Sequence, residues 1–399
     1  MKQIITHLTD TDFYKYTMGQ WILHRYPNVR THWKFKIRTA GVQTDNLVDE
    51  VNRQLDMVAQ LRHTKEELDY LAKIPWFTQD YIEFLEDLQL KRRYIKCYAE
   101  NGQVAIEAEG PELNVQWWEI FCLQIVQELW MGEITEEDRK VGDANLDVMI
   151  DEYNKLIEVG KKFTLSDFGS RRRASKEWQE HVIQRMIKEC KAFVGTSNVY
   201  FAMKYGVKPI GTFAHQTYAI TQGLDNVPVR QAQIEVLEGW TKEYRGDLGI
   251  ALSDNFGFKA FLKDFDKYHM KLFDGCRHDS GNPFVWGDML IDAYKKNGIN
   301  PMTKVACFSD GLDTQDVIDI VNYFDGKINI AIGQGTKMMN NLGRKALSMV
   351  MKVVETNGKP VVKLSDAPGK TMCENQEYID YVKKVYEYEP IPELAGHAI

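Results

Sequence analysis

Short apolar runs alternate with amphipathic stretches through the middle of the chain. Residues 163–168 predict a strand, and the apolar side chains of residues 178–190 recur with the 3.6-residue period of a helix. Val305–Phe308 predicts another strand, followed by a helix with one apolar face over residues 317–324. Further runs of strand length lie at Val207–Ile210, Leu248–Leu252 and Ile328–Ile332. Strands separated by helices pair in parallel, so this pattern predicts an α/β architecture.

Two alternating segments far apart in the chain predict β-hairpins. Tyr94–Ala99 and Gln103–Ala108 are joined by Asn101-Gly102, a pair that tolerates the positive φ of a tight turn. Asn357-Gly358 joins a second pair of segments, Val350–Glu355 and Val361–Leu364. Hairpins so distant in sequence predict one β-rich domain built from both chain ends.

Aspartates follow several of the predicted strands. Ser-Asp pairs end at Asp167, Asp254 and Asp310, and Asp279-Ser280 forms a related turn. In a β/α barrel the carboxyl ends of the strands converge on the face that carries the active site. Serine and aspartate are also good N-caps, so capping of the next helix is the alternative interpretation at each position. Four such turns together favour a ligand site.

Composition and charge narrow the classes of function. The 399 residues are enough for two or three domains, and 44% hydrophobic residues are typical of a globular protein. With 50 basic and 57 acidic side chains the net charge is −7, which argues against nucleic-acid binding through bulk positive charge. An anionic substrate would therefore need locally placed cations. The six cysteines form no Cys-x-x-Cys pair, so reduced thiols are expected and a structural zinc is not.

The chain lacks the continuous apolar run of about 20 residues that a membrane span requires. Its first residues include Asp10 and Asp12, where a secretory leader would be apolar. We therefore expect a cytoplasmic protein without a membrane partner.

Three segments carry candidate chemistry. Arg171–Arg173 places three cations between a predicted strand and helix, which suits phosphate. The pattern Gly333-x-Gly335-Thr336, after the strand at 328–332, is a second candidate phosphate cradle, although it lacks the third glycine of the dinucleotide fingerprint. His215 follows the predicted strand at 207–210, and both a structural and a catalytic role are open for it.

Longer motifs give a resemblance over the whole chain. The blocks that carry it are Thr11-Asp12-Phe13-Tyr14-Lys15, Asp167-Phe168-Gly169-Ser170-Arg171-Arg172-Arg173, Gly195-Thr196-Ser197-Asn198, Arg277-His278-Asp279-Ser280-Gly281, Phe308-Ser309-Asp310 and Leu364-Ser365-Asp366-Ala367-Pro368-Gly369-Lys370. In these the chain resembles bacterial nicotinate phosphoribosyltransferases. The resemblance implies an irregular (β/α) barrel of the type II phosphoribosyltransferase kind over residues 131–344. It also implies an α+β domain over residues 1–130, completed by about residues 345–399.

The same resemblance implies the reaction. The 5-phosphoribosyl group would pass from phosphoribosyl pyrophosphate to nicotinate, giving nicotinate mononucleotide and pyrophosphate for NAD biosynthesis. Phe168 would stack on one face of the pyridine ring, and Tyr14 from the other subunit of a homodimer would stack on the opposite face. Ser197 stands where nicotinamide-specific relatives carry Asp, and because an aspartate would repel the carboxylate of nicotinate, serine favours nicotinate.

Further roles follow from the resemblance. Arg277 would meet the ring pocket or the phosphoribosyl group, and Arg171 the phosphate end. Asp279 and Asp310 would hold the ribose hydroxyls or the metal-bound pyrophosphate. The 5-phosphate would lie in the cradle of Gly335 and Thr336.

His215 matches the histidine that ATP phosphorylates in this family. ATP hydrolysis would then be coupled to product formation, with Mg²⁺ accompanying the phosphates and its protein ligands unassigned. A neutral imidazole can accept a phosphoryl group near pH 7. Gln216 stands where bacterial relatives usually carry Glu, which removes a charge beside His215.

Three other functions are alternatives to nicotinate phosphoribosyl transfer. Nicotinamide phosphoribosyltransferase is disfavoured by Ser197. Quinolinate phosphoribosyltransferase would call for more basic residues around the ring of a diacid. A metabolite-binding sensor without turnover would fit if the strand-end aspartates only capped helices.

Overall fold

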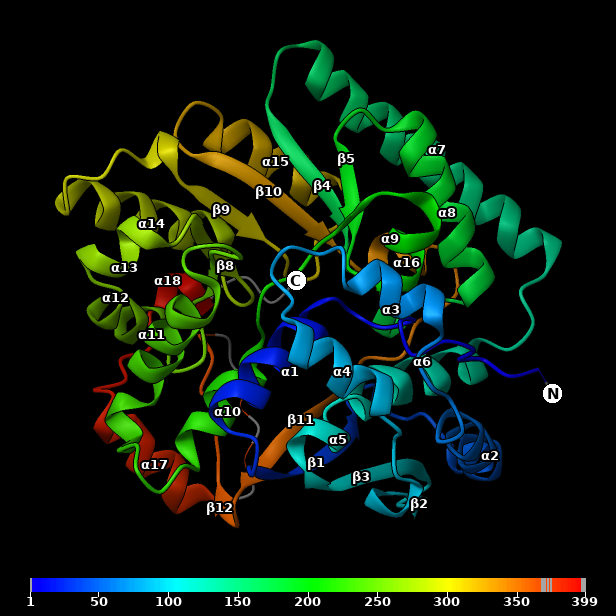
Figure 1. Cartoon of the computed structure of the whole chain (residues 1–399). Coiled ribbons are helices and arrows are strands. Elements are labelled where there is room, and N and C mark those ends of the chain that lie inside the picture. The colour runs from blue at the N-terminus through cyan, green and yellow to red at the C-terminus, as the bar shows by residue number, and fades with distance from the viewer. Residues whose placement is uncertain (1, 367–370, 372, 374, 396–399) are drawn as a thin grey trace. The chain divides into compact units, whose positions relative to one another are not determined.

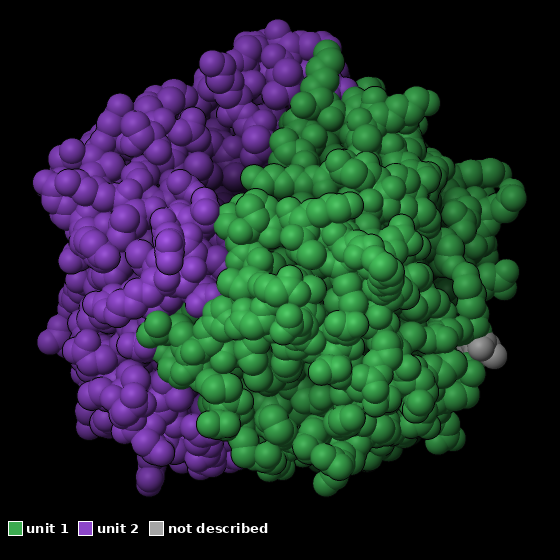
Figure 2. Space-filling view, viewed as in Figure 1, with its two compact units in different colours: residues 1–151, 167–211, 335–353 green, residues 152–166, 212–334, 354–399 purple. Residues whose placement is uncertain are grey.

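The chain forms two compact units. The computed structural model describes residues 2–366, 371, 373 and 375–395. Unit 1 comprises residues 1–151, 167–211 and 335–353, and unit 2 comprises residues 152–166, 212–334 and 354–399 (Figure 2). The domain bounds expected from the sequence, 1–130 with 345–399 and 131–344, stay a prediction.

One antiparallel sheet brings the two chain ends together. Its strands are ordered β12-β11-β1-β3-β2, with bounds β1 Arg30–Ile37, β2 Ile95–Glu100, β3 Gln103–Pro111, β11 Met349–Thr356 and β12 Lys359–Pro360 (Figure 1). Strands β2 and β3 form the first expected hairpin, and Asn101 and Gly102 adopt φ of +50° and +75° at its turn. The expected α+β part built from both chain ends is confirmed.

The second hairpin is shorter than the sequence predicts. Strand β12 ends at Pro360, and its register with β11 covers residues 355–356 and 359–360. The Val361 N–H still donates to the Val354 carbonyl at 3.1 Å, but no strand continues over Val361–Leu364, so the expected return strand is wrong there. The backbone there has other partners, because the Leu364 N–H donates to the carbonyl of Asn255 at 2.8 Å. The Val362 N–H donates to the Gln222 side chain at 3.0 Å.

A second sheet holds the strands expected in the middle of the chain. Its order is β6-β5-β4-β10-β9-β8-β7, and the register of β7, β8, β9 and β10 is parallel. The bounds are β4 Phe163–Asp167, β5 Phe193–Thr196, β6 Lys208–Pro209, β7 Ile250–Leu252, β8 Gly275–His278, β9 Val305–Phe308 and β10 Asn329–Gln334 (Figure 1). Strand β7 begins two residues later than expected, since Leu248 adopts a φ of +53°. This curled parallel sheet confirms the expected α/β fold of the irregular-barrel kind.

Helices surround both sheets. In unit 1 they are α1 Tyr14–Arg25, α2 Val48–Val58, α3 Lys65–Leu71, α4 Gln79–Asp87, α5 Glu112–Val115, α6 Trp118–Met131, α8 Lys176–Glu189, α9 Val199–Tyr205 and α16 Thr336–Met339. In unit 2 they are α10 His215–Gln222, α11 Ala232–Tyr244, α12 Phe258–Asp264, α13 Lys267–Leu272, α14 Pro283–Lys296, α15 Thr314–Phe324, α17 Gln376–Val385 and α18 Pro392–Ala395. Helix α7, Glu136–Glu158, has residues in both units. Among the described residues, none of these helices combines the length and the apolar content needed to cross a bilayer.

The strand-end aspartates do not cap the helices that follow them. The N-caps of α8, α12, α14 and α15 are Ser175, Gly257, Asn282 and Asp313. The capping interpretation is therefore wrong at Asp167, Asp254, Asp279 and Asp310. Their carboxylates are left for other contacts.

A buried aromatic layer fixes the strand ends of unit 2. The ring of Trp286 on α14 packs against Phe308 at the end of β9, with centroids 5.4 Å apart. The indole N–H of Trp286 donates to the Ser253 hydroxyl at 3.0 Å, and that hydroxyl donates to the Arg277 carbonyl at 2.8 Å. These bonds tie the loop after β7 to strand β8, so the residues that follow both strands have fixed positions.

Candidate active site

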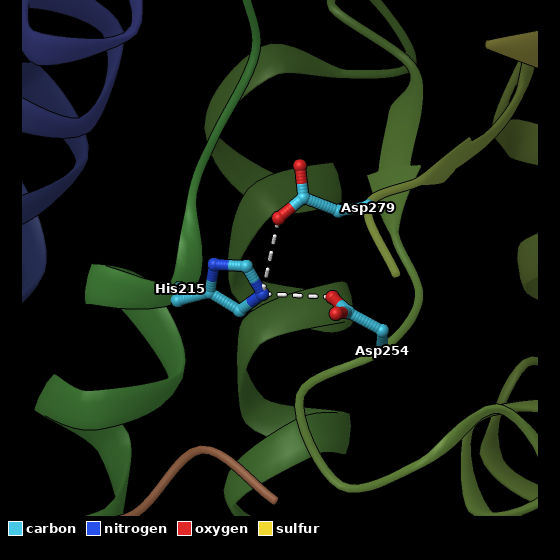
Figure 3. Close-up of side chains that lie close together, drawn as sticks. All are labelled: His215, Asp254 and Asp279. Atoms are coloured by element: carbon cyan, nitrogen blue, oxygen red, sulfur yellow. Dashed lines mark hydrogen bonds and ion pairs between the residues drawn. The ribbon is translucent and has the colours of Figure 1, made fainter. Parts of the chain in front are cut away.

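Four charged or titratable side chains from separate segments of unit 2 form the first cluster. The Nε2 atom of His215, at the start of α10, lies 2.7 Å from Oδ1 of Asp254 and 3.9 Å from Oδ2 of Asp279 (Figure 3). The Nζ atom of Lys363 lies 2.7 Å from Oδ2 of Asp254 and 3.7 Å from Oδ2 of Asp279. The Ser280 hydroxyl also donates to Oδ2 of Asp254 at 2.7 Å. We call His215, Asp254, Asp279 and Lys363 the histidine cluster.

Burial and charge set the ionisation of the histidine cluster. Burial lowers the pKa of His215 to about 4, and the positive charge of Lys363 acts in the same direction. Burial alone would raise the pKa of Asp279, but Arg277 and Lys363 lower it to about 2. Burial likewise opposes ionisation of Asp254, yet Lys363 and His215 hold the pKa of Asp254 well below its ordinary value. At neutral pH the cluster therefore contains a neutral imidazole between two carboxylates.

The hydrogen bond to Asp254 assigns the tautomer of His215. Because the Asp254 carboxylate only accepts, Nε2 of the neutral ring carries the proton and donates it. The lone pair of His215 then lies on Nδ1, on the side of the ring away from Asp254 (Figure 3). His215 is thus prepared as a nucleophile or base through Nδ1.

Three side chains of the histidine cluster offer atoms that could bind a metal ion. One ligand atom each from His215, Asp254 and Asp279 lies within 4.8 Å of the others. Mg²⁺ prefers an octahedron of oxygen ligands. Here one donor is an imidazole nitrogen that already donates to Asp254, and the Lys363 ammonium group contacts both carboxylates. The cluster does not fit a resident Mg²⁺.

Two further expected site residues belong to neighbouring strands of unit 2. Arg277 lies in β8 and is half-buried, and its buried Nε has no hydrogen-bond partner among the described residues. Asp310 lies two residues after the end of β9 and is half-buried. The charge of Arg277 reaches Asp279, as the low pKa of that carboxyl shows.

The second cluster lies in unit 1. The Ser197 hydroxyl donates to Oδ1 of Asp12 at 2.8 Å, and Nε of Arg171 lies 3.7 Å from Oδ2 of the same carboxylate. The Phe13 N–H donates to the Ser197 carbonyl at 2.7 Å, which holds the two segments together. Burial raises the pKa of Asp12, although the Arg171 charge opposes this. We call Asp12, Arg171 and Ser197 the serine cluster.

In unit 1, the loop that carries Phe168 and Gly169 packs directly on the segment that begins at Gly335, which we call the glycine loop. A Cβ atom on Gly335 would lie 3.1 Å from the Phe168 carbonyl oxygen, and one on Gly169 would lie 2.3 Å from Cγ of Met339. Gly169 is therefore needed for this close approach, and a side chain at Gly335 would make a tight contact. Thr336 begins α16 beside them, and Phe168 is half-buried.

Tyr14 begins α1 and is 7% exposed. Its backbone nitrogen lies 3.0 Å from where a Cβ on Gly211 would be, so the start of α1 is packed closely against residue 211. A contribution of Tyr14 to the site of a second subunit stays a prediction.

The three consecutive arginines divide between surface and interior. Arg171 is 45% exposed, whereas Arg173 is fully buried. Its guanidinium donates to both oxygens of Asp10, at 2.6 and 3.0 Å, and to Glu128 at 2.7 Å. The interpretation of this run as one positive patch for phosphate is therefore wrong for Arg173, because two carboxylates already occupy its donors. Asp10 also accepts a hydrogen bond from Asn198 at 2.8 Å. Because Asn198 is the residue after Ser197, the pair of Arg173 and Asp10 helps to position the serine cluster.

Sequence reasoning missed three residues of these clusters. Asp254 was one of the Ser-Asp pairs, and Asp12 lies in a quoted motif, but neither was assigned a role. Lys363 directly precedes the quoted motif that begins at Leu364. The pattern of strand-end aspartates could have found Asp254, whereas nothing local in the sequence distinguishes Lys363 from other lysines.

Fold and clusters together define a class of protein. Parallel strands alternate with helices, and titratable side chains gather where the strands end, as in α/β proteins that bind ligands at the carboxyl ends of their strands. Known proteins narrow this class. The sequence model of the nicotinate phosphoribosyltransferase (NAPRTase) family matches residues 163–390, and that of its N-terminal domain matches residues 9–127.

Relatives of known name agree over almost the whole chain. Proteins named nicotinate phosphoribosyltransferase from Xylella fastidiosa and Chromobacterium violaceum are each 42% identical, covering 97–98% of this chain and 98% of their own. The crystal structure of nicotinate phosphoribosyltransferase from Vibrio cholerae superposes with a TM-score of 0.91 at 32% identity, covering 98% of this chain and 96% of its own. The chain belongs to the nicotinate phosphoribosyltransferase family, and the expected resemblance is confirmed.

Proposed function

We propose that this enzyme transfers the 5-phosphoribosyl group from phosphoribosyl pyrophosphate to nicotinate, with ATP hydrolysis coupled through a phosphohistidine at His215. Membership of the family supports the transfer reaction. The observation that carries the coupling is the 2.7 Å hydrogen bond from Nε2 of His215 to Asp254. That bond leaves Nδ1 as the nucleophilic atom of a neutral ring.

This geometry allows phosphoryl transfer from ATP to His215 in one balanced step. The Nδ1 lone pair attacks the γ-phosphorus of ATP, the bond between that phosphorus and the β,γ-bridging oxygen breaks, and ADP leaves with the electron pair. The proton on Nε2 stays in its hydrogen bond to Asp254, where the carboxylate stabilises the positive charge that develops on the ring. The histidine cluster does not fit Mg²⁺ as a resident ion. We propose instead that Mg²⁺ enters the site bound to the phosphates of ATP or phosphoribosyl pyrophosphate.

Transfer of the phosphoribosyl group builds positive charge on the anomeric carbon of the ribose and negative charge on the leaving pyrophosphate. We assign Asp279 and Asp310 to the ribose and its departing group, and Arg277 and Arg171 to phosphate oxygens. The unsatisfied Nε of Arg277 supports this, because a buried guanidinium nitrogen gains from an anionic acceptor. The close-packed glycine loop at Gly335 and Thr336 would hold the 5-phosphate.

The serine cluster supports nicotinate as the acceptor. Phe168 offers an aromatic face to the pyridine ring, with Tyr14 of a second subunit on the other side. The Ser197 hydroxyl, which now donates to Asp12, can rotate to donate to the carboxylate of nicotinate. An aspartate in its place would add a second carboxylate beside Asp12 and disfavour an acidic substrate.

Incubation with γ-labelled ATP tests the coupling. We expect acid-labile protein-bound label in the wild type and none in His215→Asn, since the amide cannot accept the phosphoryl group. Equal label in the two proteins would refute the role of His215.

A further inference from the structure

Lys363 has no role in the reaction as described so far. We propose that its ammonium group is a catalytic group, which moves from the two carboxylates beside His215 onto the phosphoryl group that His215 accepts. This inference rests on the proposed phosphohistidine. In this proposal the positive charge that balances the phosphoryl group comes from a side chain of the protein, the Lys363 ammonium group.

The position and the burial of Lys363 show that its contacts with the two carboxylates are part of the folded structure. The Lys363 side chain is 7% exposed, and its Nζ atom is 2.7 Å from Asp254 and 3.7 Å from Asp279. Burial of an ammonium group is costly unless carboxylates pair with it, so this lysine cannot be a surface residue that happens to lie nearby. Both of its partners are also the carboxylates that face His215.

The backbone fixes Lys363 in this place. The N–H of the next residue, Leu364, donates to the carbonyl of Asn255, directly after Asp254. Three residues beyond Lys363, the Asp366 carboxylate accepts from the Phe258 N–H at 3.0 Å, at the start of α12. The lysine is thus anchored to the same loop that carries Asp254, while its Nζ atom is at the end of a flexible four-carbon stem that can carry it from one acceptor to another.

Charge balance requires a cation when His215 is phosphorylated. With a neutral ring, the resting cluster holds two carboxylates and one ammonium group. A phosphoryl group adds about two negative charges at neutral pH. The negative charges of Asp254 and Asp279 would oppose this added charge within the buried cluster. Among the described residues, Lys363 is the cation that contacts both of these carboxylates, so it is placed to follow the added charge.

The alternative is that Lys363 only donates a hydrogen bond to Asp254 and keeps the loop in place. Three substitutions separate the two roles. Lys363→Gln keeps an N–H donor and removes the charge, Lys363→Arg keeps the charge, and Lys363→Met removes both. Lys359→Met is the matched control, because Lys359 lies four residues away and pairs with Asp225 at 2.7 Å on the surface.

The test is the rate of acid-labile labelling by γ-labelled ATP at saturating ATP, with melting temperatures recorded for every variant. We expect Lys363→Met and Lys363→Gln to label roughly 10- to 100-fold more slowly than the wild type, as befits loss of a charged contact to the reacting group. Lys363→Arg should recover much of the rate, and Lys359→Met should match the wild type.

A wild-type rate in Lys363→Gln would overturn the proposal, since a donor without charge would then suffice. If Lys363→Met does not fold, the comparison of Gln with Arg still decides. Absence of label from the wild type would remove the phosphohistidine itself, and the role of Lys363 with it. The two failures can be told apart. An unlabelled wild type refutes the phosphohistidine, whereas equal labelling rates in the wild type and Lys363→Gln refute only the role of Lys363.

Discussion

At the scale of single residues, the reactivity of His215 is set by neighbours that are distant in the sequence. Burial and Lys363 lower its pKa to about 4, while Asp254 orients the ring. The imidazole is therefore neutral over the whole physiological range, so in the proposed coupling it would need no proton transfer before attacking phosphorus. A histidine at its ordinary pKa would be partly protonated near pH 6.

This predicts a low titration midpoint for His215. In an NMR titration of histidine-labelled protein, we expect one ring to titrate at about pH 4, and the His215→Asn spectrum identifies that ring by its absence. A midpoint near the ordinary value of about 6.5 would contradict the described environment.

Ser197 gives a second prediction at this scale. Ser197→Asp would place a carboxylate against Asp12 and against the acid group of nicotinate, so the KM for nicotinate should rise by roughly 10- to 100-fold. The same variant should gain activity with nicotinamide. Ser197→Ala, which removes the hydroxyl without adding charge, is the control and should change the preference much less. An unchanged KM for nicotinate in Ser197→Asp would show that Ser197 does not contact the substrate.

The residue scale also shows where sequence reasoning stops. Arg171, Arg172 and Arg173 are identical in type and adjacent, yet Arg173 is fully buried and Arg171 is exposed. The difference comes from Asp10 and Glu128, which are 163 and 45 residues away. Only tertiary structure brings these partners together, so a local pattern cannot assign the buried arginine.

At the scale of elements, a buried ion network joins α6 to the loop after β4. One guanidinium, that of Arg173, serves both Asp10 and Glu128. Asp10 takes two of its donors and keeps a low pKa, whereas burial raises the pKa of Glu128 to about 7 despite Arg173. The folded chain therefore binds the proton of Glu128 more tightly than the unfolded chain does.

This predicts the pH dependence of stability. The stabilisation from protonated Glu128 is complete below about pH 4.5 and is lost as the pH rises through about 7. Glu128→Gln cannot ionise, so relative to the wild type it should gain about 1–3 kcal/mol in the free energy of unfolding between about pH 4.5 and 8. Urea unfolding at several pH values measures this. A constant difference between the two proteins would show that folding does not raise the pKa of Glu128.

Elements with local signals could be predicted from the sequence. The β2–β3 turn depends on Asn101 and Gly102 alone, so its hairpin was found with nearly correct bounds. The return strand of the second hairpin failed because Gln222 and Asn255, far away in the chain, take the backbone bonds of residues 362 and 364. The aspartates at strand ends were located correctly, but their contacts depend on tertiary structure.

At the scale of the whole molecule, the residues of the proposed site belong to two compact units. The histidine cluster lies in unit 2, and the serine cluster lies in unit 1. We propose a homodimer in which Tyr14 of one subunit serves the site that contains His215 of the other. A symmetric dimer would then hold two such shared sites.

Mixed dimers test this arrangement. Tyr14→Ala and His215→Asn should each be inactive in the ATP-coupled reaction, but their heterodimer would contain one intact site. Refolding or co-expressing the two variants together should restore about a quarter of wild-type activity, because half of the dimers are mixed and each has one working site. No recovery would place Tyr14 in the same subunit's site, and each variant refolded alone is the control.

The most direct measurement is product formation from nicotinate and phosphoribosyl pyrophosphate, with and without ATP, beside the same assay with nicotinamide. We predict nicotinate mononucleotide and pyrophosphate as products, greater product formation when ATP is present, and little product from nicotinamide. Turnover of nicotinamide in preference to nicotinate would contradict the assigned substrate. Binding of both substrates without pyrophosphate release would contradict the assigned reaction.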